Sequence, residues 1–309
     1  MSIVEKLLGN GPSGYGYGST AEDVTDGLSL DGKTYLVTGC NSGLGLETMR
    51  VLALRGARVI AAARTEEKAR AASADLAGEI VPVACELAEP ASVKACVEKV
   101  RSFGWKLDGI VCNAGIMALP KLETAHGYEL QFFTNHIGHF QLVTGLLDEL
   151  GEAGRVVMLS SEGHRMAPKG GIDFDNLDGS KGYGSWRAYG RAKLANLLFA
   201  KELSRRFAGT KRTANAVHPG VIATNLTRHF GSVVEGAMKV FSPLLMKSTA
   251  QGAATQVYAL THPALAGVSG EYLASCNRKK PSGYADDAEL ARRLWQVSEK
   301  IVAEVSPPR

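Results

Sequence analysis

A tyrosine and a lysine stand four residues apart in the segment YGRAKLAN, residues 189–196. The apolar spacing of this segment predicts a helix, on which residues at i and i+4 lie on one face. We therefore expect the Lys193 ammonium beside the Tyr189 phenol. A neighbouring cation favours the phenolate and lowers a phenol pKa, ordinarily near 10, by roughly 1 to 3 pH units. Such a pair could exchange a proton near neutral pH, although this spacing alone also occurs by chance on solvated helix faces.

A glycine-rich segment lies upstream, where residues 35–45 read YLVTGCNSGLG. An apolar run, three glycines and then helical periodicity predict a strand, a tight loop and a helix. The glycines let the backbone approach a ligand closely, and the helix offers free amides and a positive dipole end to a pyrophosphate. An ordinary glycine turn is the alternative. The residues expected to bind a dinucleotide here are Gly39, Asn41, Ser42, Gly43, Leu44 and Gly45.

Four further motifs follow in order along the chain: CNAG at 112–115, TNHIGHF at 134–140, a serine pair at 160 and 161, and HPGVIAT at 218–224. With the glycine loop and the Tyr-Lys pair, they make the chain resemble the short-chain dehydrogenase/reductase superfamily over about residues 30–275. The segments NHIGHF and YGRAKLAN most resemble the retinol dehydrogenase and WW-domain oxidoreductase branch. The resemblance implies an oxidoreductase that uses a nicotinamide cofactor.

Length and composition are consistent with one domain that has a large hydrophobic core. The 309 residues are 45% hydrophobic and 21% charged, which suits a single α/β domain. The net charge of +4 is spread out, so nucleic acid or an anionic membrane is not indicated. Five cysteines without a Cys-x-x-Cys spacing fit a reducing compartment, and a cytoplasmic protein is expected. No apolar stretch reaches the roughly 18 residues of a membrane span.

Strands alternate with helices along most of the chain. After the first strand, further strands are expected at residues 57–63, 80–84, 107–112, 155–159, 213–217 and 269–273, and helices at 46–55, 66–76, 91–103, 124–150 and 189–207. This alternation predicts right-handed crossovers and ligands bound at the carboxyl ends of the strands. We therefore predict an α/β, doubly wound Rossmann fold with a seven-stranded parallel sheet flanked by helices on both faces. Residues 1–30 form an irregular arm, and residues 31–309 a single domain.

The resemblance also implies catalytic roles. Ser161 would hydrogen-bond the substrate oxygen, with Ser160 as the competing candidate and a strand-end cap as the alternative. Asn135 would hold a water that links Lys193 to solvent, unless it merely faces solvent. Two histidines, His136 and His139, could share a helix face, but no third ligand is near and we predict no metal site.

Cofactor contacts are implied at three further segments. Asn113, Ala114 and Gly115 would pass beneath the adenine ribose, and Lys193 would also bind the nicotinamide ribose. The loop that holds the carboxamide and a phosphate would use Pro219, Gly220, Ile222 and Thr224. Glu86 and Leu87 would border the adenine, although the family more often has aspartate where this chain has Glu86.

Arg64 predicts which cofactor is used. It follows the second strand, where NAD-specific proteins of this fold usually carry an acid for the ribose 2′-hydroxyl. The arginine fork suits a phosphate instead, which favours NADP(H). A solvent-facing arginine, or one paired with Glu66 or Glu67, is the alternative.

These residues together predict hydride transfer between a carbonyl and an alcohol, with Tyr189 as general acid and base. A small-to-medium lipophilic substrate is expected, because two segments that can border the cleft, 162–188 and 225–247, carry apolar and aromatic residues. Those in the first segment are Met166, Phe174, Tyr183 and Trp186. Helix packing or the subunit interface of a homo-oligomer could claim the same residues. A sugar-nucleotide epimerase or a non-catalytic dinucleotide sensor is the alternative function.

Overall fold

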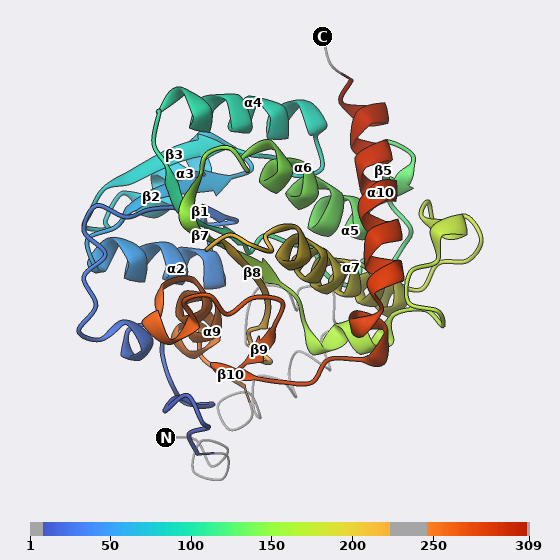
Figure 1. Cartoon of the computed structure of the whole chain (residues 1–309). Coiled ribbons are helices and arrows are strands. Elements are labelled where there is room, and N and C mark those ends of the chain that lie inside the picture. The colour runs from blue at the N-terminus through green and yellow to red at the C-terminus, as the bar shows by residue number, and fades with distance from the viewer. Residues whose placement is uncertain (1–8, 223–245, 308–309) are drawn as a thin grey trace.

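A computed structural model describes residues 9–222 and 246–307 and is built around one large sheet (Figure 1). The sheet has eight strands in the order β10-β9-β8-β7-β4-β1-β2-β3. Their bounds are Thr34–Thr38 (β1), Arg58–Ala63 (β2), Ile80–Ala84 (β3), Leu107–Cys112 (β4), Leu150–Leu159 (β7), Thr213–His218 (β8), Tyr272–Ala274 (β9) and Asn277–Arg278 (β10). The predicted α/β fold of the Rossmann type is confirmed.

The predicted strand number is one too small. Seven strands are parallel to their neighbours, and β10 is added by an antiparallel hairpin in which Asn277 pairs with Ala274. The two-residue turn between them, Ser275 and Cys276, has φ angles of 48° and 62°. Such turns usually carry glycine, asparagine or aspartate, so no residue signature predicted this one.

Helices cover both faces of the sheet (Figure 1). One face packs against α4 (Pro90–Ser102), α6 (Gly138–Gly145), α7 (Ser185–Arg206) and α10 (Ala288–Val305), and the other against α2 (Gly43–Leu54), α3 (Glu66–Ser73) and α9 (Thr249–Thr261). In β1, Leu36 packs into the first core whereas Tyr35 and Val37 pack into the second, as the two-residue period of a strand requires. Every residue of β1 is buried, which is typical of a central parallel strand.

The helix predicted over residues 124–150 is wrong at both ends. This region instead forms a short hairpin, one turn of α-helix, a π-helical turn and α6, bounded as Thr124–Ala125 (β5), Tyr128–Glu129 (β6), Leu130–Phe132 (α5), Phe133–Ile137 and Gly138–Gly145. His126 and Gly127 have positive φ angles of 52° and 83°, which end any helix there. The Glu129 carboxylate then caps the new helix by accepting from the amides of Gln131 and Phe132.

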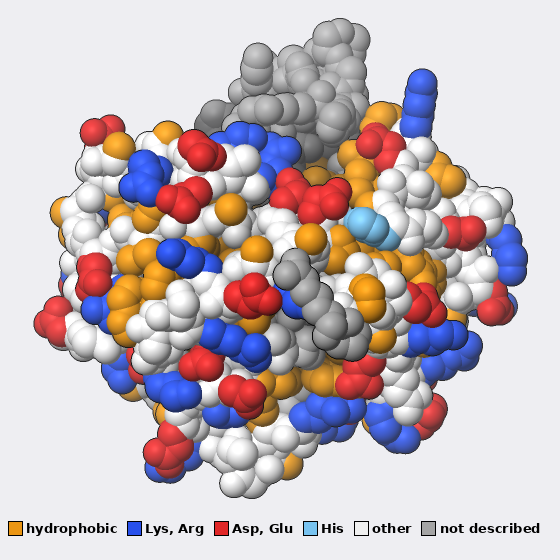
Figure 2. Space-filling model, turned by 90° about the horizontal axis from the view of Figure 1, so that it is seen from above, with side chains coloured by type: hydrophobic (Ala, Val, Ile, Leu, Met, Phe, Trp, Pro, Cys, Tyr) orange, Lys and Arg blue, Asp and Glu red, His pale blue; other side chains and the backbone are white. Residues whose placement is uncertain are grey.

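The described part of the N-terminal arm lies against α2 and α9. Its 3₁₀ turn, Asp23–Thr25, is held by the Ala21 amide, which donates to the Ala250 carbonyl over 2.9 Å, and Val24 is buried. In the part of the chain that the structure describes, no helix is long and apolar enough to span a bilayer. Lysine and arginine side chains are interspersed with acidic ones on the face shown in Figure 2.

Candidate active site

The glycine loop between β1 and α2 depends on close backbone contacts. Gly39 has a φ of 67°, and a Cβ atom there would lie 2.9 Å from the Ala114 Cα. A Cβ atom on Gly45 would collide with the Gly39 carbonyl and lie 2.6 Å from Asn113 Nδ2. The residue before α2, Ser42, is exposed and makes no side-chain cap, so the first helical amides stay free. Loop and helix together form a cradle that fits a pyrophosphate.

Thr38, which sequence reasoning did not single out, ties this loop to β4. Its hydroxyl accepts from the amides of Asn113 and Ala114, each over 3.0 Å, and its carbonyl accepts from Asn113 Nδ2 over 2.8 Å. Gln256 of α9 adds a contact from Nε2 to Asn113 Oδ1 over 3.3 Å. A threonine before a glycine loop carries no distinctive signal, because its partners Asn113 and Ala114 lie 75 and 76 residues further along the chain.

A buried histidine completes this network. His139 Nδ1 lies 2.9 Å from the Asn135 carbonyl, which can only accept, so Nδ1 carries the proton. Its Nε2 therefore accepts from the Thr38 hydroxyl, over 2.9 Å. Burial lowers the pKa of His139 to about 4, so the ring is neutral at physiological pH. The other histidine of the pair, His136, lies 2.9 Å from the Ser298 hydroxyl.

No cluster of three or more His, Cys, Asp or Glu side chains is placed to hold a metal in residues 9–222 and 246–307. Both ring nitrogens of His139 make protein hydrogen bonds, and His136 makes one through Nε2.

Asn135 lies in the π-helical turn and is fully buried, so the solvent-facing alternative is wrong. Its Oδ1 accepts from the Ile116 amide over 2.8 Å, and its Nδ2 donates to the Ile116 carbonyl over 2.9 Å. Gly115 allows this approach, because a Cβ atom there would lie 3.0 Å from Asn135 Oδ1 and 3.5 Å from Lys193 Nζ. Asn135 thus fixes the backbone beside Lys193.

Helix α7 carries Tyr189 and Lys193 through the protein interior, since residues 188–200 are all buried. The Lys193 Nζ lies 5.7 Å from the centroid of the Tyr189 ring and donates to the Leu159 carbonyl over 3.0 Å. Burial lowers the pKa of Lys193 to about 8. Burial also raises the pKa of Tyr189, against the smaller effect of a hydrogen bond with Ser161.

The prediction that Lys193 lowers the pKa of the Tyr189 phenol is therefore wrong for the protein without a bound cofactor. Loss of solvation outweighs the other effects on the phenol, and the ammonium is directed to Leu159.

The two adjacent serines at the end of β7 have different surroundings. Ser160 is 1% exposed and its hydroxyl donates to the Lys193 carbonyl over 2.8 Å, so it is engaged with α7. Ser161 lies in the cleft beside Tyr189, and its hydroxyl accepts from the Gly163 amide over 3.0 Å. His164 also accounts for the position of Ser161, because its Nδ1 donates to the Ser161 carbonyl and its Nε2 accepts from the Ser282 amide.

A cleft of about 300 Å³ opens beside these groups. The predicted site residues that line it are Leu44, Asn113, Gly115, Ser161, Tyr189, Lys193, Pro219, Gly220 and Ile222. Apolar side chains line it as well. Met166, Trp186 and Met246 belong to the predicted cleft segments, whereas Ile116, Met117, Leu159 and Val221 were not predicted. Three of these apolar side chains, Met166, Trp186 and Val221, are 41%, 39% and 60% exposed.

The predicted cleft segments contribute only in part. Phe174 packs against the core with the Arg293 guanidinium 4.3 Å above its ring, and Tyr183 donates to the Leu119 carbonyl, so neither lines this cleft. Thr224 and residues 225–245 lie outside the described residues. Within the second segment, Met246 lines the cleft and Lys247 is buried, with Nζ donating to the Ser275 hydroxyl over 3.1 Å.

The residues assigned to the adenosine end lie away from the cleft. Arg64 follows β2, is exposed, and makes no hydrogen bond or ion pair with any residue that the structure describes. Glu66 pairs instead with Arg70 over 2.5 Å. The Glu86 carboxylate accepts from the Ala88 amide, and Leu87 is buried with its carbonyl against Gly138.

Known proteins are similar to this chain in sequence and in architecture. Residues 33–174 match the family model for short chain dehydrogenases. Short-chain dehydrogenase TIC 32 B, chloroplastic, of Brassica napus is 42% identical over 98% of this chain and 99% of its own length. Retinol dehydrogenase 12 of Mus musculus is 40% identical over 89% of this chain and 87% of its own. A crystal structure of an uncharacterised protein of Mycobacterium paratuberculosis, 33% identical, covers 90% of this chain and 96% of its own with a TM-score of 0.73.

These likenesses extend over nearly the whole chain, and the glycine loop, Ser161, Tyr189 and Lys193 meet at one edge of the sheet. The protein therefore belongs to the short-chain dehydrogenase/reductase family of oxidoreductases, in the branch of the retinol dehydrogenases and the WW domain-containing oxidoreductase.

Proposed function

We propose that this protein is an NADP(H)-dependent enzyme that interconverts a lipophilic carbonyl compound and its alcohol. The observation that carries the proposal is the cleft itself, where Ser161, Tyr189 and Lys193 stand next to the glycine-loop residue Leu44. When bound, the nicotinamide supplies or accepts the hydride. The protein holds the substrate oxygen between the Ser161 and Tyr189 hydroxyls and keeps the reacting atoms in position.

Tyr189 gives the proton in the reducing direction and removes it in the oxidising direction. Its raised pKa keeps the hydroxyl protonated at neutral pH in the protein by itself, which suits a donor to a carbonyl oxygen. Removal of that proton needs added positive charge, which Lys193 and an oxidised nicotinamide would provide. Asn135 supports Lys193, because its side chain fixes Ile116 and the backbone beside the Lys193 ammonium.

The preference for NADP(H) rests on Arg64. Its guanidinium is exposed at the end of β2 and is unpaired among the described residues, while Glu66 is taken by Arg70. A free guanidinium at this position can bind a ribose 2′-phosphate through two parallel hydrogen bonds.

The proposal of a lipophilic substrate is based on the apolar side chains that line the cleft. Met166, Trp186 and Val221 stay substantially exposed there. Exposed apolar side chains grouped around a concave site are typical of binding sites for apolar ligands. A cytoplasmic location and a homo-oligomer stay predictions, and relatives such as TIC 32 B carry the word chloroplastic in their names.

The test is consumption of NADPH at 340 nm with a panel of aldehydes and ketones. We expect turnover with aromatic, terpenoid or steroid carbonyls, at a higher catalytic efficiency than with short polar aldehydes or sugars. Higher efficiency with the polar compounds would overturn the substrate class. Tight NADPH binding without turnover of any compound would favour a dinucleotide sensor. Tight binding of NAD together with epimerisation of a sugar nucleotide would favour the epimerase.

A further inference from the structure

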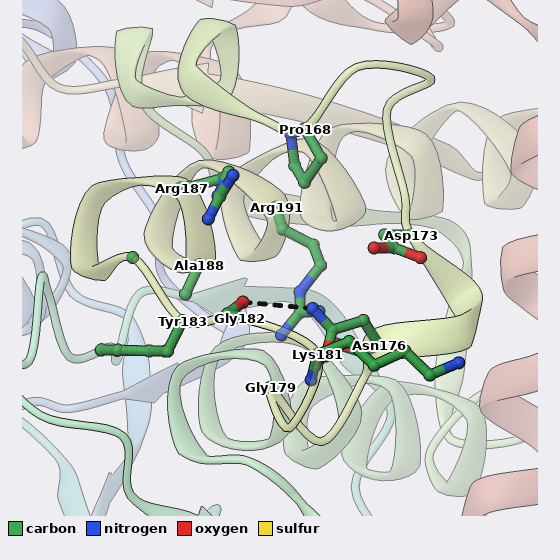
Figure 3. Close-up of a pocket in the computed structure, with 11 residues that line it drawn as sticks. Pro168, Asp173, Asn176, Gly179, Lys181, Gly182, Tyr183, Arg187, Ala188 and Arg191 are labelled. Atoms are coloured by element: carbon green, nitrogen blue, oxygen red, sulfur yellow. Dashed lines mark hydrogen bonds between the residues drawn. The ribbon is translucent and has the colours of Figure 1, made fainter.

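A second hollow, of about 100 Å³, lies beside α7 and is shown in Figure 3. Its walls are the loop over residues 168–184 and the first two turns of α7, and we call it the charged pocket. Arg187 and Arg191 line it and stand two residues before and after Tyr189, which places them on the opposite face of the helix. The charged pocket and the active-site cleft share no lining residue.

Arg191 is the central side chain of the charged pocket in Figure 3. It is only 4% exposed. Its Nη1 donates to the Asn176 carbonyl over 2.5 Å, and its Nη2 lies 3.4 Å from the Glu129 carboxylate. Its Nε is buried and has no hydrogen-bond partner among the described residues. A buried donor without an acceptor is unfavourable, so the pocket lacks one acceptor.

The charged side chains of the lining favour an anionic acceptor. Glu129 balances Arg191, which leaves two cations in the lining, Lys181 and Arg187, against one acid, Asp173. The Asp178 carboxylate, which does not line the pocket, also lies near Arg191 and Lys181. Lys181 and Arg187 are both exposed, and neither side chain pairs with an acid in residues 9–222 or 246–307. In Figure 3 they lie on opposite sides of Arg191, with Asp173 on the same side as Lys181.

The start of α7 adds to this field. Gly184, which precedes the 22-residue helix, offers no side-chain cap, and Gly184, Arg187 and Ala188 all line the pocket. The first amides of such a helix carry partial positive charge and bind anions readily.

We propose that the charged pocket is a second ligand site, separate from the active-site cleft, that binds a small oxyanion of the phosphate or carboxylate class. Its volume has room for one, since a single water needs roughly 10 to 15 Å³. The anion accepts from Arg191 Nε and is balanced by Arg187 and Lys181. Its binding joins the 168–184 loop to the helix that carries Tyr189 on its other face.

Isothermal titration calorimetry on the full chain tests the proposal, with sodium sulfate in one arm and sodium acetate in the other. We expect saturable binding that the Lys181→Ala/Arg187→Ala variant weakens at least about tenfold, the effect of one charge-assisted hydrogen bond. Lys169→Ala is the matched control, because Lys169 is an exposed lysine of the same loop that does not line the pocket. Tighter sulfate indicates a phosphate-bearing ligand, and tighter acetate a carboxylate.

Crystals soaked in selenate locate the anion. The proposal expects an anomalous peak within hydrogen-bond distance of Arg191 Nε, absent in the double variant. Three results would overturn the proposal: a water molecule in place of the anion at Arg191 Nε, no saturable binding in the titration, or affinity weakened equally by Lys169→Ala and the double variant. Neither experiment measures turnover, so the result is independent of the proposed reaction. If an anion binds at the glycine loop as well, the double variant should leave the affinity of that loop unchanged.

Discussion

The carboxyl edge of the sheet has two sides that are built in opposite ways. On the β1 side, backbone meets backbone, and Gly39 and Gly45 leave no space for even one methyl group against Ala114 and Asn113. On the α7 side, long polar side chains are buried, and burial shifts the pKa values of Tyr189 and Lys193. The β1 side depends on the absence of a side chain at Gly39 and Gly45, whereas the α7 side depends on single polar atoms, the Tyr189 hydroxyl oxygen and Lys193 Nζ. Substitutions should therefore separate binding from chemistry.

The largest effect is expected on the α7 side. Tyr189→Phe keeps the ring and removes only the hydroxyl, so turnover should fall at least about 100-fold, as expected for loss of a positioned acid. Dissociation constants for NADPH should stay close to the wild-type value. Steady-state kinetics and fluorescence titration measure the two quantities, and near-normal turnover in this variant would exclude Tyr189 as the proton donor.

Arg64→Ala should show the next largest effect, at the adenosine end. A hydrogen bond to a charged group contributes roughly 1.5 to 3 kcal/mol, and every 1.4 kcal/mol is tenfold. NADPH should therefore bind about 10-fold to 150-fold more weakly while NADH hardly changes. A wild type that binds NADH more tightly, or an equal loss for both cofactors, would show that Arg64 does not read the phosphate.

Gly45→Ala should disturb the β1 side without touching Tyr189. The added methyl group collides with the Gly39 carbonyl, and overpacking of this kind costs about 1 to 3 kcal/mol. We expect that loss in the free energy of unfolding, measured in urea, together with weaker NADPH binding. Gly283→Ala is the control, because a Cβ atom at Gly283 meets nothing within 4 Å. Equal stability of both variants would contradict the tight loop.

The smallest effect is a pH dependence of several-fold. Burial lowers the pKa of Lys193 to about 8, so the ammonium is present below that pH and is lost above it. Affinity for NADPH should fall between pH 7 and pH 9 in the wild type and stay flat in Lys193→Met. Between pH 8 and the ordinary lysine value near 10.4, only the unfolded chain holds this proton, so the Lys193 contribution to stability should rise with pH. An unchanged affinity across this range would argue against a cofactor contact from Lys193.

The two sides also differ in what the sequence could predict. The glycine loop and the strand-helix alternation follow from local patterns, and the α/β fold was predicted from them. The helix at 124–150 was wrong because His126 and Gly127 form a turn, and β10 was missed because Ser275 and Cys276 take positive φ angles without glycine. The raised pKa of Tyr189 and the unpaired Arg191 Nε could not be predicted, because both depend on burial by segments distant in the sequence.

Direct hydride transfer is tested most directly with NADPH that carries deuterium at one or the other C4 position. The best carbonyl substrate from the panel is reduced with each labelled cofactor, and the alcohol is examined by mass spectrometry. We expect one deuterium on the carbinol carbon from only one of the two cofactors, and far less labelled product with Tyr189→Phe in the same time. An alcohol without deuterium from either cofactor would contradict the proposed reaction.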